Sequence, residues 1–466
     1  MTRKRSVAVL AAGLAAITTV TAFTGLAVAT PAAASPTHRP AVRVRPAVAG
    51  HVTAVAEVAP LPTSECLSLA GIHCYSPIQY RKAYQLDSLY ARGITGAGRT
   101  ILIVDSFGSP TIQQDLDAFD AQWGLPDTTV QIVQAGVIPP FDPTDALRVN
   151  WAQETTLDVE YAHAVAPGAH LVLLETPVAE TEGVTGLPEM MDAEKALIDA
   201  GVGDVISQSF SATENTFPGF DSGDFSSLLN LRYAFKAAAQ HRVTVLASSG
   251  DAGATNFDND FNLYPFPVNA WPSTDPLVTS LGGTQLVLDD QGNRTQPDVV
   301  WNDGFGAGGG GFSSVFPRPV FQLGVRSVVG NHRGTPDISM SASVDGGCWV
   351  YYTFVDPDSP WHVFGGTSEA TPLFAGIVAL ADQLAGHRLG NLNAALYLLG
   401  AASRLRHPPL STGLVDVTTG DNSFAGVTGY PAGRGYDLAS GWGTIDAPAF
   451  VRALAASEFG GTQVGT

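Results

Sequence analysis

The segment Gly365-Gly-Thr-Ser-Glu-Ala-Thr-Pro372 combines a glycine turn with a serine, Ser368, that could act as a nucleophile. An apolar run over residues 373–380 follows, so Ser368 is expected at the start of a long buried helix. Free backbone N–H groups and the helix dipole favour a developing negative charge there, as acyl transfer requires. The alternative interpretation is that Thr367 or Ser368 only caps the helix.

A pair of carboxyl groups supplies a candidate base. Glu154 and Asp158 are four residues apart in the segment from Trp151 to Ala169, so they share one face of a helix. Like charges at this spacing are mildly destabilising, so the pair needs a reason other than stability. Glu160 points elsewhere on the helix and is expected to be a salt-bridge or surface residue.

The pattern of apolar residues predicts a scaffold for these groups. Short runs rich in β-branched residues predict buried parallel strands at residues 100–105, 130–133, 170–174, 204–207 and 243–247. Amphipathic segments predict helices at 111–123, 154–165, 190–199 and 226–240. This alternation predicts an α/β domain with a mainly parallel central sheet, in which functional groups gather at the carboxyl ends of the strands.

The segments and their order along the chain resemble the sedolisins, also called serine-carboxyl peptidases. The likeness rests on Gly-Thr-Ser368-x-x-x-Pro, on the Glu154-x-x-x-Asp158 helix that ends in Ala-Pro-Gly-Ala, and on Ala247-Ser-Ser-Gly-Asp251-Ala-Gly253. Segments 271–284, 310–313 and 333–337 agree as well, and the likeness extends from about Tyr75 to Asp446. It implies a subtilisin-like fold with helices on both faces of the sheet and a single large catalytic domain.

The resemblance also implies a secreted serine-type endopeptidase that hydrolyses peptide bonds through an acyl-enzyme. By position, Ser368 is the nucleophile, Glu154 its general base, Asp158 the acid that orients Glu154, and Asp251 the oxyanion donor. Without the resemblance, Asp251 would be taken for a turn residue. A carboxyl base works near its own pKa and only a protonated Asp251 can donate a hydrogen bond, so we expect an optimum of roughly pH 3 to 5.

Two segments near the C-terminus resemble the family's calcium loop. They are Asp416-Val417-Thr and Gly433-Arg-Gly435-Tyr-Asp437. The resemblance implies one structural Ca²⁺, held by two carboxylates and by main-chain carbonyls of Val417, Gly433 and Gly435. The alternative is a glycine-rich turn with aspartate caps.

The N-terminal region is expected to direct export. Three basic residues precede an Ala/Val/Leu-rich run, so residues 1–34 are predicted to be a signal peptide. A flexible Pro/Ala-rich leader with a short Cys66–Cys74 loop is predicted at 35–74, the peptidase domain at 75–450 and a tail at 451–466. The leader is too short for the folded pro-segment that the resemblance would imply. Cys348 is expected to be buried and unpaired.

The charge balance limits the partners. The chain has 43 acidic and 24 basic residues, and every acidic residue lies beyond residue 50. Nucleic acid is therefore not an expected partner, and no later run is long enough to span a bilayer. We expect a monomer, free of the membrane after signal removal, that acts on peptide or protein substrates.

Two alternatives stay open. A conventional subtilase would use Asp105 as the acid of a Ser/His/Asp triad, but its His-Gly-Thr motif is absent and the next histidine is His163, inside the helix. His362, near Ser368 in the chain, is expected to be a surface or loop residue. An inert peptide-binding homologue is the other alternative, and the intact four-residue constellation argues against it. The segment Ser207-Gln-Ser-Phe-Ser211 departs from the family's Ser-x-Ser-Trp-Gly, so substrate contacts at that edge are expected to differ.

Overall fold

The computed structural model describes residues 52–405 and 411–457, all within one compact unit that spans residues 40–466. The predicted signal peptide lies outside the described residues, as does the leader before residue 52. Within the described ranges, no helix combines the length and the apolar composition that a bilayer crossing requires.

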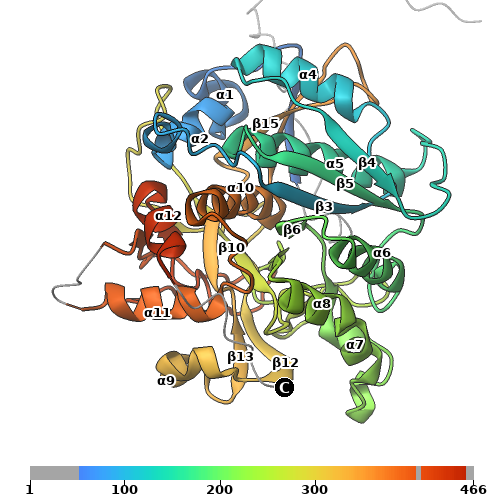
Figure 1. Ribbon diagram of the computed structural model, residues 1–466, viewed down its shortest axis with the longest axis vertical. Helices are drawn as coiled ribbons and strands as arrows, with labels where there is room; N and C mark the ends of the chain where they lie inside the picture. The colour runs from blue at the N-terminus through green and yellow to red at the C-terminus, as the bar shows by residue number, and fades with distance from the viewer. Residues whose placement is uncertain (1–51, 406–410, 458–466) are drawn as a thin grey trace, which may run out of the picture. The chain divides into compact units, whose positions relative to one another are not determined.

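A largely parallel sheet forms the centre of the fold (Figure 1). Its strand order is β11-β10-β8-β6-β3-β5-β4, and β14 also pairs with β10. Only the β10–β11 pair is antiparallel. The strands are β3 (Thr100–Ser106), β4 (Val130–Gln134), β5 (His170–Thr176), β6 (Val205–Gln208), β8 (Thr244–Ser248), β10 (Thr279–Gln285), β11 (Val299–Val300) and β14 (Ile338–Ser341). The expected α/β fold class is confirmed.

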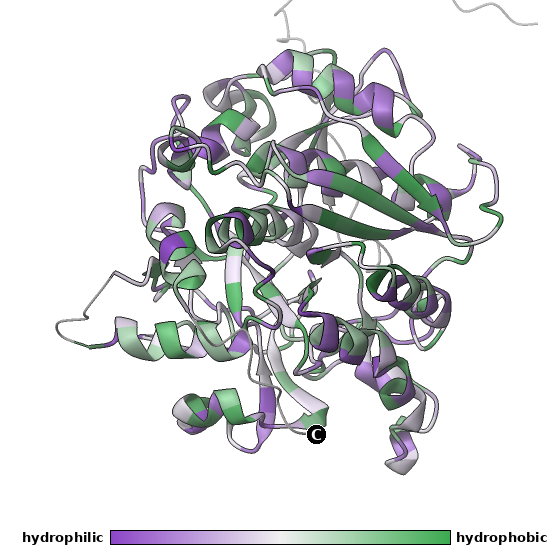
Figure 2. Cartoon of the chain, viewed as in Figure 1, coloured by the Kyte–Doolittle hydropathy of each residue, from purple (hydrophilic) through white to green (hydrophobic). Residues whose placement is uncertain are grey.

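Helices cover both faces of this sheet, and β3 shows why. Ile101 and Ile103 belong to a core shared with α5 (Ala146–Val165) and α10 (Thr367–Ala385). Leu102 and Val104 belong to a second core with α6 (Leu187–Asp199) and α8 (Tyr233–His241). Because successive side chains of a strand point to opposite faces, a strand buried on both sides must be apolar throughout. The central strands are accordingly hydrophobic along most of their length in Figure 2.

Helix α5 is enclosed by the rest of the domain. It begins at Ala146 rather than at Glu154, with the Asp145 carboxylate accepting the N–H of Leu147 as its cap, and every residue from Val149 to Val165 is buried. The expectation that Glu160 is a salt-bridge or surface residue is therefore wrong. Its carboxylate accepts the backbone N–H of Tyr351 at 3.1 and 3.3 Å, because β15 packs over this side of the helix.

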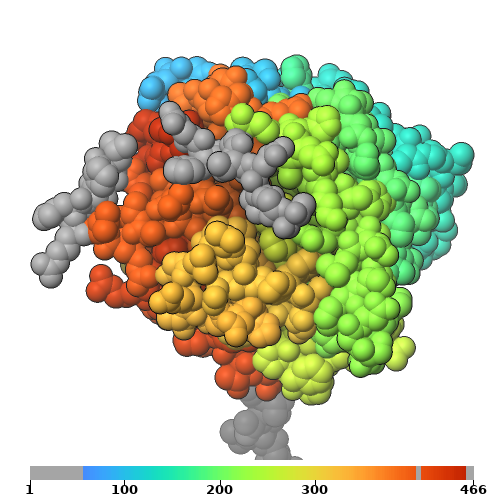
Figure 3. Space-filling view, turned by 60° about the horizontal axis from the view of Figure 1, so that its bottom comes forward, coloured from blue at the N-terminus to red at the C-terminus, as the bar shows by residue number. Residues whose placement is uncertain are grey.

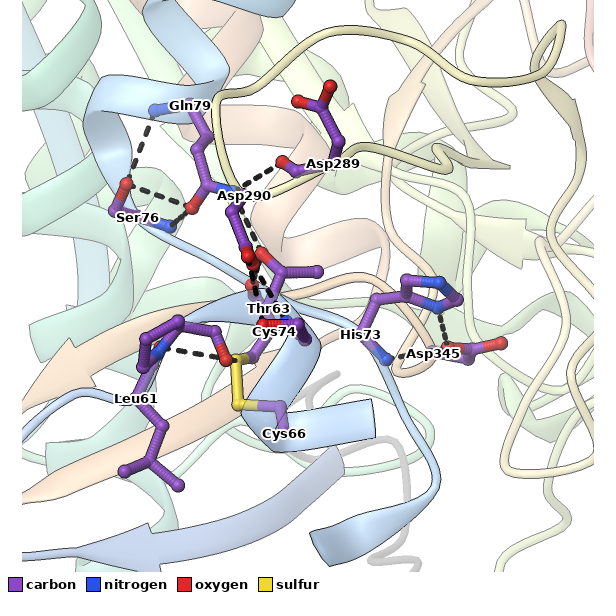
Figure 4. Close-up of a disulfide and its surroundings, with 12 residues drawn as sticks. Leu61, Thr63, Cys66, His73, Cys74, Ser76, Gln79, Asp289, Asp290 and Asp345 are labelled. Carbon is purple, nitrogen blue, oxygen red and sulfur yellow. Dashed lines mark hydrogen bonds and ion pairs between the residues drawn. A yellow bond between two sulfur atoms is a disulfide. The ribbon is translucent and has the colours of Figure 1, made fainter. Parts of the chain in front are cut away.

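The region predicted as a flexible leader is folded from residue 52 onward, which corrects the boundary at residue 75. Strand β1 (Val52–Glu57) pairs antiparallel with β16 (Trp361–Gly365) at the edge of a second sheet of order β1-β16-β15-β2. Helix α1 (Thr63–Ala70) follows, and the expected Cys66–Cys74 disulfide is confirmed (Figure 4). The composition indicated disorder, but a strand needs only a free sheet edge to pair with. Cys348 is buried and unpaired, as expected.

The C-terminal boundary also differs from the prediction. Helix α12 (Ala447–Ala455) continues beyond residue 450, and Val451 and Leu454 are buried in the core, so residues 451–455 belong to the domain and not to a tail. The remaining helices are α2 (Pro77–Ala83), α3 (Asp87–Tyr90), α4 (Ile112–Trp123), α7 (Ser226–Leu229), α9 (Arg326–Val329) and α11 (Asn393–Ser403).

Short strands and single turns complete the described chain. The strands are β2 (Cys74–Tyr75), β7 (Ala212–Thr213), β9 (Ala270–Trp271), β12 (Gly311–Pro317), β13 (His332–Thr335), β15 (Gly347–Tyr351), β17 (Leu414–Val415) and β18 (Thr444–Ile445). Turns of 3₁₀ helix occur at Glu214–Thr216, Phe220–Ser222, Asn230–Arg232 and Val320–Val325. In Figure 3 the yellow-orange segment that carries β12, β13 and α9 lies on the surface beside the green segment of α7 and α8.

Candidate active site

Ser368 lies in the first turn of α10, as the sequence predicts. The N-cap of this helix is Gly366, at a φ of 141°, and no side chain caps it, so the alternative in which Thr367 or Ser368 serves only as a cap is wrong. Gly365 is required for close packing, because a Cβ there would lie 2.6 Å from the backbone nitrogen of Val344. The buried Ser368 hydroxyl donates to the carbonyl oxygen of Ser209 at 3.4 Å.

Pro372 explains a second contact at this turn. A proline has no N–H, so it cannot bond the carbonyl four residues earlier, which is that of Ser368. The Ser209 hydroxyl lies 3.4 Å from this carbonyl oxygen and donates to Asp158 Oδ1 at 2.8 Å. Ser209 follows strand β6 directly and so connects helix α5 with the first turn of α10.

Three carboxyl groups cluster beside this turn: Glu154 and Asp158 on α5, and Asp105 near the carboxyl end of β3. All three are fully buried. Burial raises the pKa of Asp158 well above its usual range, and the charges of Asp105 and Glu154 raise it further. Burial and then the charge of Glu154 do the same to the pKa of Asp105. Carboxyls this close cannot all be ionised at once, so the cluster holds protons at acidic pH.

Asp251 approaches the same turn from the loop after β8. Its Oδ1 accepts the Thr367 backbone N–H at 2.7 Å and the Thr367 hydroxyl at 2.8 Å. Its Oδ2 is buried and has no hydrogen-bond partner among residues 52–405 and 411–457. Burial raises the pKa of Asp251 to about 8, and the charge of Glu154 contributes in the same direction. Because Oδ1 already accepts two bonds, the proton of the neutral acid belongs on Oδ2.

The histidines that the sequence left as alternatives have other partners. His163 Nε2 lies 2.9 Å from the carbonyl oxygen of Pro126 and 3.3 Å from Asp120 Oδ2. His362 is buried rather than exposed, because its ring stacks on Tyr352 at 4.0 Å between centroids, and burial lowers its pKa to about 4. In the described part of the chain, no hydrogen bond joins either imidazole to Ser368. The Ser/His/Asp alternative therefore lacks a base.

Comparison with known proteins shows what the chain is similar to. No family model matches the chain. It is 31% identical over 384 residues to kumamolisin of Bacillus sp. (strain MN-32) and 28% identical over 398 residues to sedolisin of Pseudomonas sp. (strain 101). These alignments cover 79% and 83% of this chain, which spans 62% of the length of each relative. A solved structure of Pseudomonas sedolisin, a serine-carboxyl proteinase complexed with two molecules of pseudo-iodotyrostatin, matches with a TM-score of 0.67 and 26% identity, over 83% of this chain and 100% of that one. The chain is therefore similar to the sedolisin family.

Two residues of this site were not assigned to it from the sequence. Asp105 was considered only as the acid of a conventional triad, and Ser209 only as part of an altered strand end. The signal for both is a polar residue at the carboxyl end of a buried parallel strand, where functional groups gather in α/β sheets. Contact with Asp158 and Ser368 depends on how α5 and α10 pack, which the sequence does not encode locally.

The two aspartates of the expected calcium loop, Asp416 and Asp437, accept hydrogen bonds from one short stretch of backbone. The Gly435 N–H donates to the two Asp416 oxygens at 2.9 and 3.1 Å, and the Gly433 N–H donates to Asp437 Oδ2 at 2.8 Å. Across the described ranges, no group of three His, Cys, Asp or Glu side chains could hold a metal ion. These residues fit calcium in kind, because oxygen ligands on a glycine-bent loop suit it, provided that main-chain carbonyls complete the set.

Proposed function

We propose that this chain is a serine-type endopeptidase that hydrolyses peptide bonds at acidic pH through an acyl-enzyme on Ser368. The observation that carries the proposal is the linkage of five residues around one helix turn. Ser209 joins Asp158 to the Ser368 carbonyl, and Asp251 accepts the backbone N–H of Thr367, the residue before Ser368. The relatives named kumamolisin and sedolisin, and the solved serine-carboxyl proteinase, support the same chemistry.

In the proposed first step, the Ser368 hydroxyl oxygen attacks the carbonyl carbon of the scissile bond while the Glu154 carboxylate accepts its proton. The carbonyl electron pair moves to oxygen, where the Oδ2–H of Asp251 donates a hydrogen bond to the oxyanion. The C–N bond then breaks, and the proton held by Glu154 passes to the leaving amine. Water repeats the sequence on the ester, with Glu154 accepting the water proton, and the proton returns to Ser368.

Asp158 and Asp105 act on the base rather than on the substrate. Neighbouring buried carboxyls titrate as a coupled group and share protons. Asp158 is fixed by the Ser209 hydroxyl, which leaves its second oxygen for the acid–base cluster. We propose that Asp158 orients Glu154 and that Asp105 takes part in proton sharing.

The remaining parts of the proposal concern the surroundings of the enzyme. We propose peptide or protein substrates, a monomer, export by the N-terminal 34 residues to the extracellular space, and one structural Ca²⁺. Its ligands would be the Asp416 and Asp437 carboxylates and the main-chain carbonyls of Val417, Gly433 and Gly435. The acidic composition and the oxygen-rich loop support these points.

Substitution of the nucleophile tests the function. We expect Ser368→Ala to lower kcat for an unstructured peptide by about 10⁴-fold at acidic pH without loss of the fold, because alanine preserves the turn and removes the attacking oxygen. Glu154→Gln should be nearly as damaging, since an amide cannot accept the proton. His163→Gln is the matched control and should retain most activity.

A labelling experiment separates the enzyme from an inert binding homologue. A peptide aldehyde should form a hemiacetal with Ser368 in the wild type at acidic pH and none in Ser368→Ala. A Ser368→Ala variant within tenfold of the wild-type rate would refute the assignment, and loss of activity only in His163→Gln would restore the Ser/His alternative.

A further inference from the structure

A buried carboxyl that the proposed chemistry does not use lies directly beside the nucleophile. Glu369 is the third residue of α10 and is fully buried. Its Oε1 lies 2.7 Å from the hydroxyl of Tyr80, which comes from α2. No Lys, Arg or His of the described ranges forms an ion pair with it.

Counting protons shows which form of Glu369 the site accepts. The Tyr80 hydroxyl has one proton, and it lies within hydrogen-bond distance of the Gly346 carbonyl oxygen at 3.1 Å as well as of Glu369. A carbonyl can only accept, so the Tyr80 proton satisfies Gly346 only if the 2.7 Å contact is donated by Glu369. If Glu369 were ionised, the Tyr80 hydroxyl would donate its hydrogen bond to Glu369 instead. The Gly346 carbonyl would then be left with a weaker partner.

Burial outweighs the groups that face Glu369, although hydrogen bonds from Tyr80, Ser341 and Cys348 lower its pKa. The facing groups are Tyr80 on α2, Ser341 on β14, Cys348 on β15 and Asp251 after β8, and Tyr161 of α5 lies behind Cys348. None of them is a base. Burial raises the pKa of Glu369 to about 8, and the nearby Asp251 adds to the shift. The two buried acids therefore resist ionisation together.

Helix α2, which carries Tyr80, is held by the segment around the disulfide, where Figure 4 shows Gln79 beside Thr63 and Cys74. Helix α2 begins with a capping box in which Ser76 and Gln79 bond each other's backbone N–H groups. The Gln79 side-chain amide donates to the Thr63 hydroxyl at 2.8 Å, and that hydroxyl donates to the Cys74 carbonyl oxygen at 2.8 Å. Edge-on contacts with Tyr75 and Tyr161 fix the Tyr80 ring.

We propose that Glu369 is a positioning residue that, as a neutral acid, ties the first turn of α10 through the Tyr80 hydroxyl to Gly346 and so fixes the orientation of Ser368. The inference rests on the proposed peptidase function. It adds a role for the N-terminal loop, which becomes part of the support behind the nucleophile. A displaced nucleophile lowers the rate of attack more than it weakens substrate binding, so the effect belongs in kcat.

The test compares Glu369 variants at a pH of about 5, where the acid is protonated. We expect Glu369→Ala and Tyr80→Phe each to lower kcat about tenfold with KM changed less than about twofold. Glu369→Gln should restore kcat to within about threefold of the wild type, because its amide still donates to Tyr80. Asp382 is the matched control, since it is a buried acid about 20 Å further along the same helix. Asp382→Ala should lower the melting temperature while leaving kcat unchanged.

The pH dependence of melting tests the neutral acid without relying on activity. With a folded-state pKa of about 8, Glu369 contributes stability that is complete below its unfolded pKa and declines as the pH rises toward 8. The melting temperature of Glu369→Gln should therefore decline less steeply with pH than that of the wild type. If the melting temperatures of the two proteins declined equally steeply with pH, the conclusion that Glu369 is a neutral acid would be wrong. A Glu369→Ala variant with wild-type kcat, or a Glu369→Gln variant as slow as Glu369→Ala, would overturn the positioning role. An inactive wild type would refute the proposed peptidase instead, and the melting comparison would still decide the state of Glu369.

Discussion

Asp251 divides its two oxygens between two tasks. Oδ1 is occupied by the N–H and hydroxyl of Thr367, and the buried Oδ2 is left to carry the proton. A carboxyl that is neutral at the working pH can donate to an oxyanion, whereas an ionised one would repel it. In the proposed mechanism, the same short loop would anchor the nucleophile turn and supply the donor.

This arrangement predicts the behaviour of Asp251→Asn. Asparagine can accept the two Thr367 bonds with its oxygen and donate from its nitrogen at any pH. With the pKa of Asp251 raised to about 8, wild-type kcat/KM should fall as pH rises toward that value, because the donor proton is lost. We expect the variant to be slower at the optimum, by about 10- to 100-fold, but to show a flatter alkaline limb.

A pH profile of kcat/KM on an unstructured peptide is the measurement. An alkaline limb as steep in Asp251→Asn as in the wild type would remove Asp251 from the oxyanion role. A wild-type optimum at or above about pH 7 would count against the carboxyl mechanism as a whole, because a histidine base gains activity toward neutral pH.

At this scale, the sequence predicts those site residues that lie in distinctive local patterns. Ser368 sits in a glycine turn before an apolar helix, and Glu154 and Asp158 share a helix face, so their positions follow from spacing. Asp105 and Ser209 lie beside Asp158 only because α5 and α10 pack around the sheet, and local sequence does not predict that packing. Glu369 was overlooked because a Glu in a first helical turn is ordinarily explained by the helix dipole.

The elements differ in how far local sequence determines them. The five predicted central strands begin within one residue of their observed starts, because strands buried on both faces have an unmistakable apolar run. The segment predicted as one helix at 226–240 is instead α7, a 3₁₀ turn and α8. Strand β1 was missed, since its pairing with β16 joins residues about 300 positions apart and leaves no local signal.

The disulfide-closed element makes a prediction about stability. Cys66 and Cys74 close a loop with a sequence separation of 8, for which loop-closure entropy corresponds to about 2–3 kcal/mol. We expect Cys66→Ser with Cys74→Ser to lower the free energy of unfolding by about that amount. Urea unfolding with and without reductant measures it. The reductant should affect only the wild type, and a reductant effect in the double variant would point to another thiol.

The calcium loop makes a separate prediction. Without an ion, the loop brings two carboxylates to one stretch of backbone, and an ion that binds only the folded state raises stability by mass action. Chelation should therefore lower the melting temperature of the wild type by several degrees, about 2–8 °C. Asp437→Ala should melt lower than the wild type and show no further change with chelator.

Asp421→Asn is the control for that experiment, because Asp421 lies in the same region outside the proposed ligand set. It should keep the response to chelator. A wild-type melting temperature that chelator leaves unchanged would remove the metal, and the loop would then be the glycine-rich turn that is the alternative.

Across the whole molecule, buried acids dominate the electrostatics. Burial raises the pKa of Glu182 and Glu214 to about 7 and that of Glu194 and Asp382 to about 8. The pKa values of several others, Asp105, Asp158, Glu160 and Glu180, are raised well above the usual range for the same reason. A protein that folds around neutral carboxyls is suited to acidic surroundings, where those groups cost least.

The sign of the stability effect follows from these shifts. A carboxyl whose folded pKa is above its unfolded value stabilises the protein fully at low pH, and that contribution is lost as pH rises from about 4 to about 8. All of these groups therefore change the stability in the same direction as the pH rises. Asp345 opposes the trend, because His73 holds its pKa below the usual value, and its contribution is lost only in strong acid.

We therefore expect the melting temperature to be highest near about pH 4–5 and to fall steadily as the pH rises to about 8. Thermal unfolding followed by circular dichroism over that range is the measurement. It should be made on Ser368→Ala, so that self-digestion is not mistaken for unfolding. Glu194→Gln and Asp382→Asn should each reduce the decline, because an amide carries no charge to bury. A melting temperature that is constant or increases between pH 5 and pH 8 would show that these carboxyls ionise without cost. The proposed restriction of activity to acidic pH would then depend on the active-site acids alone.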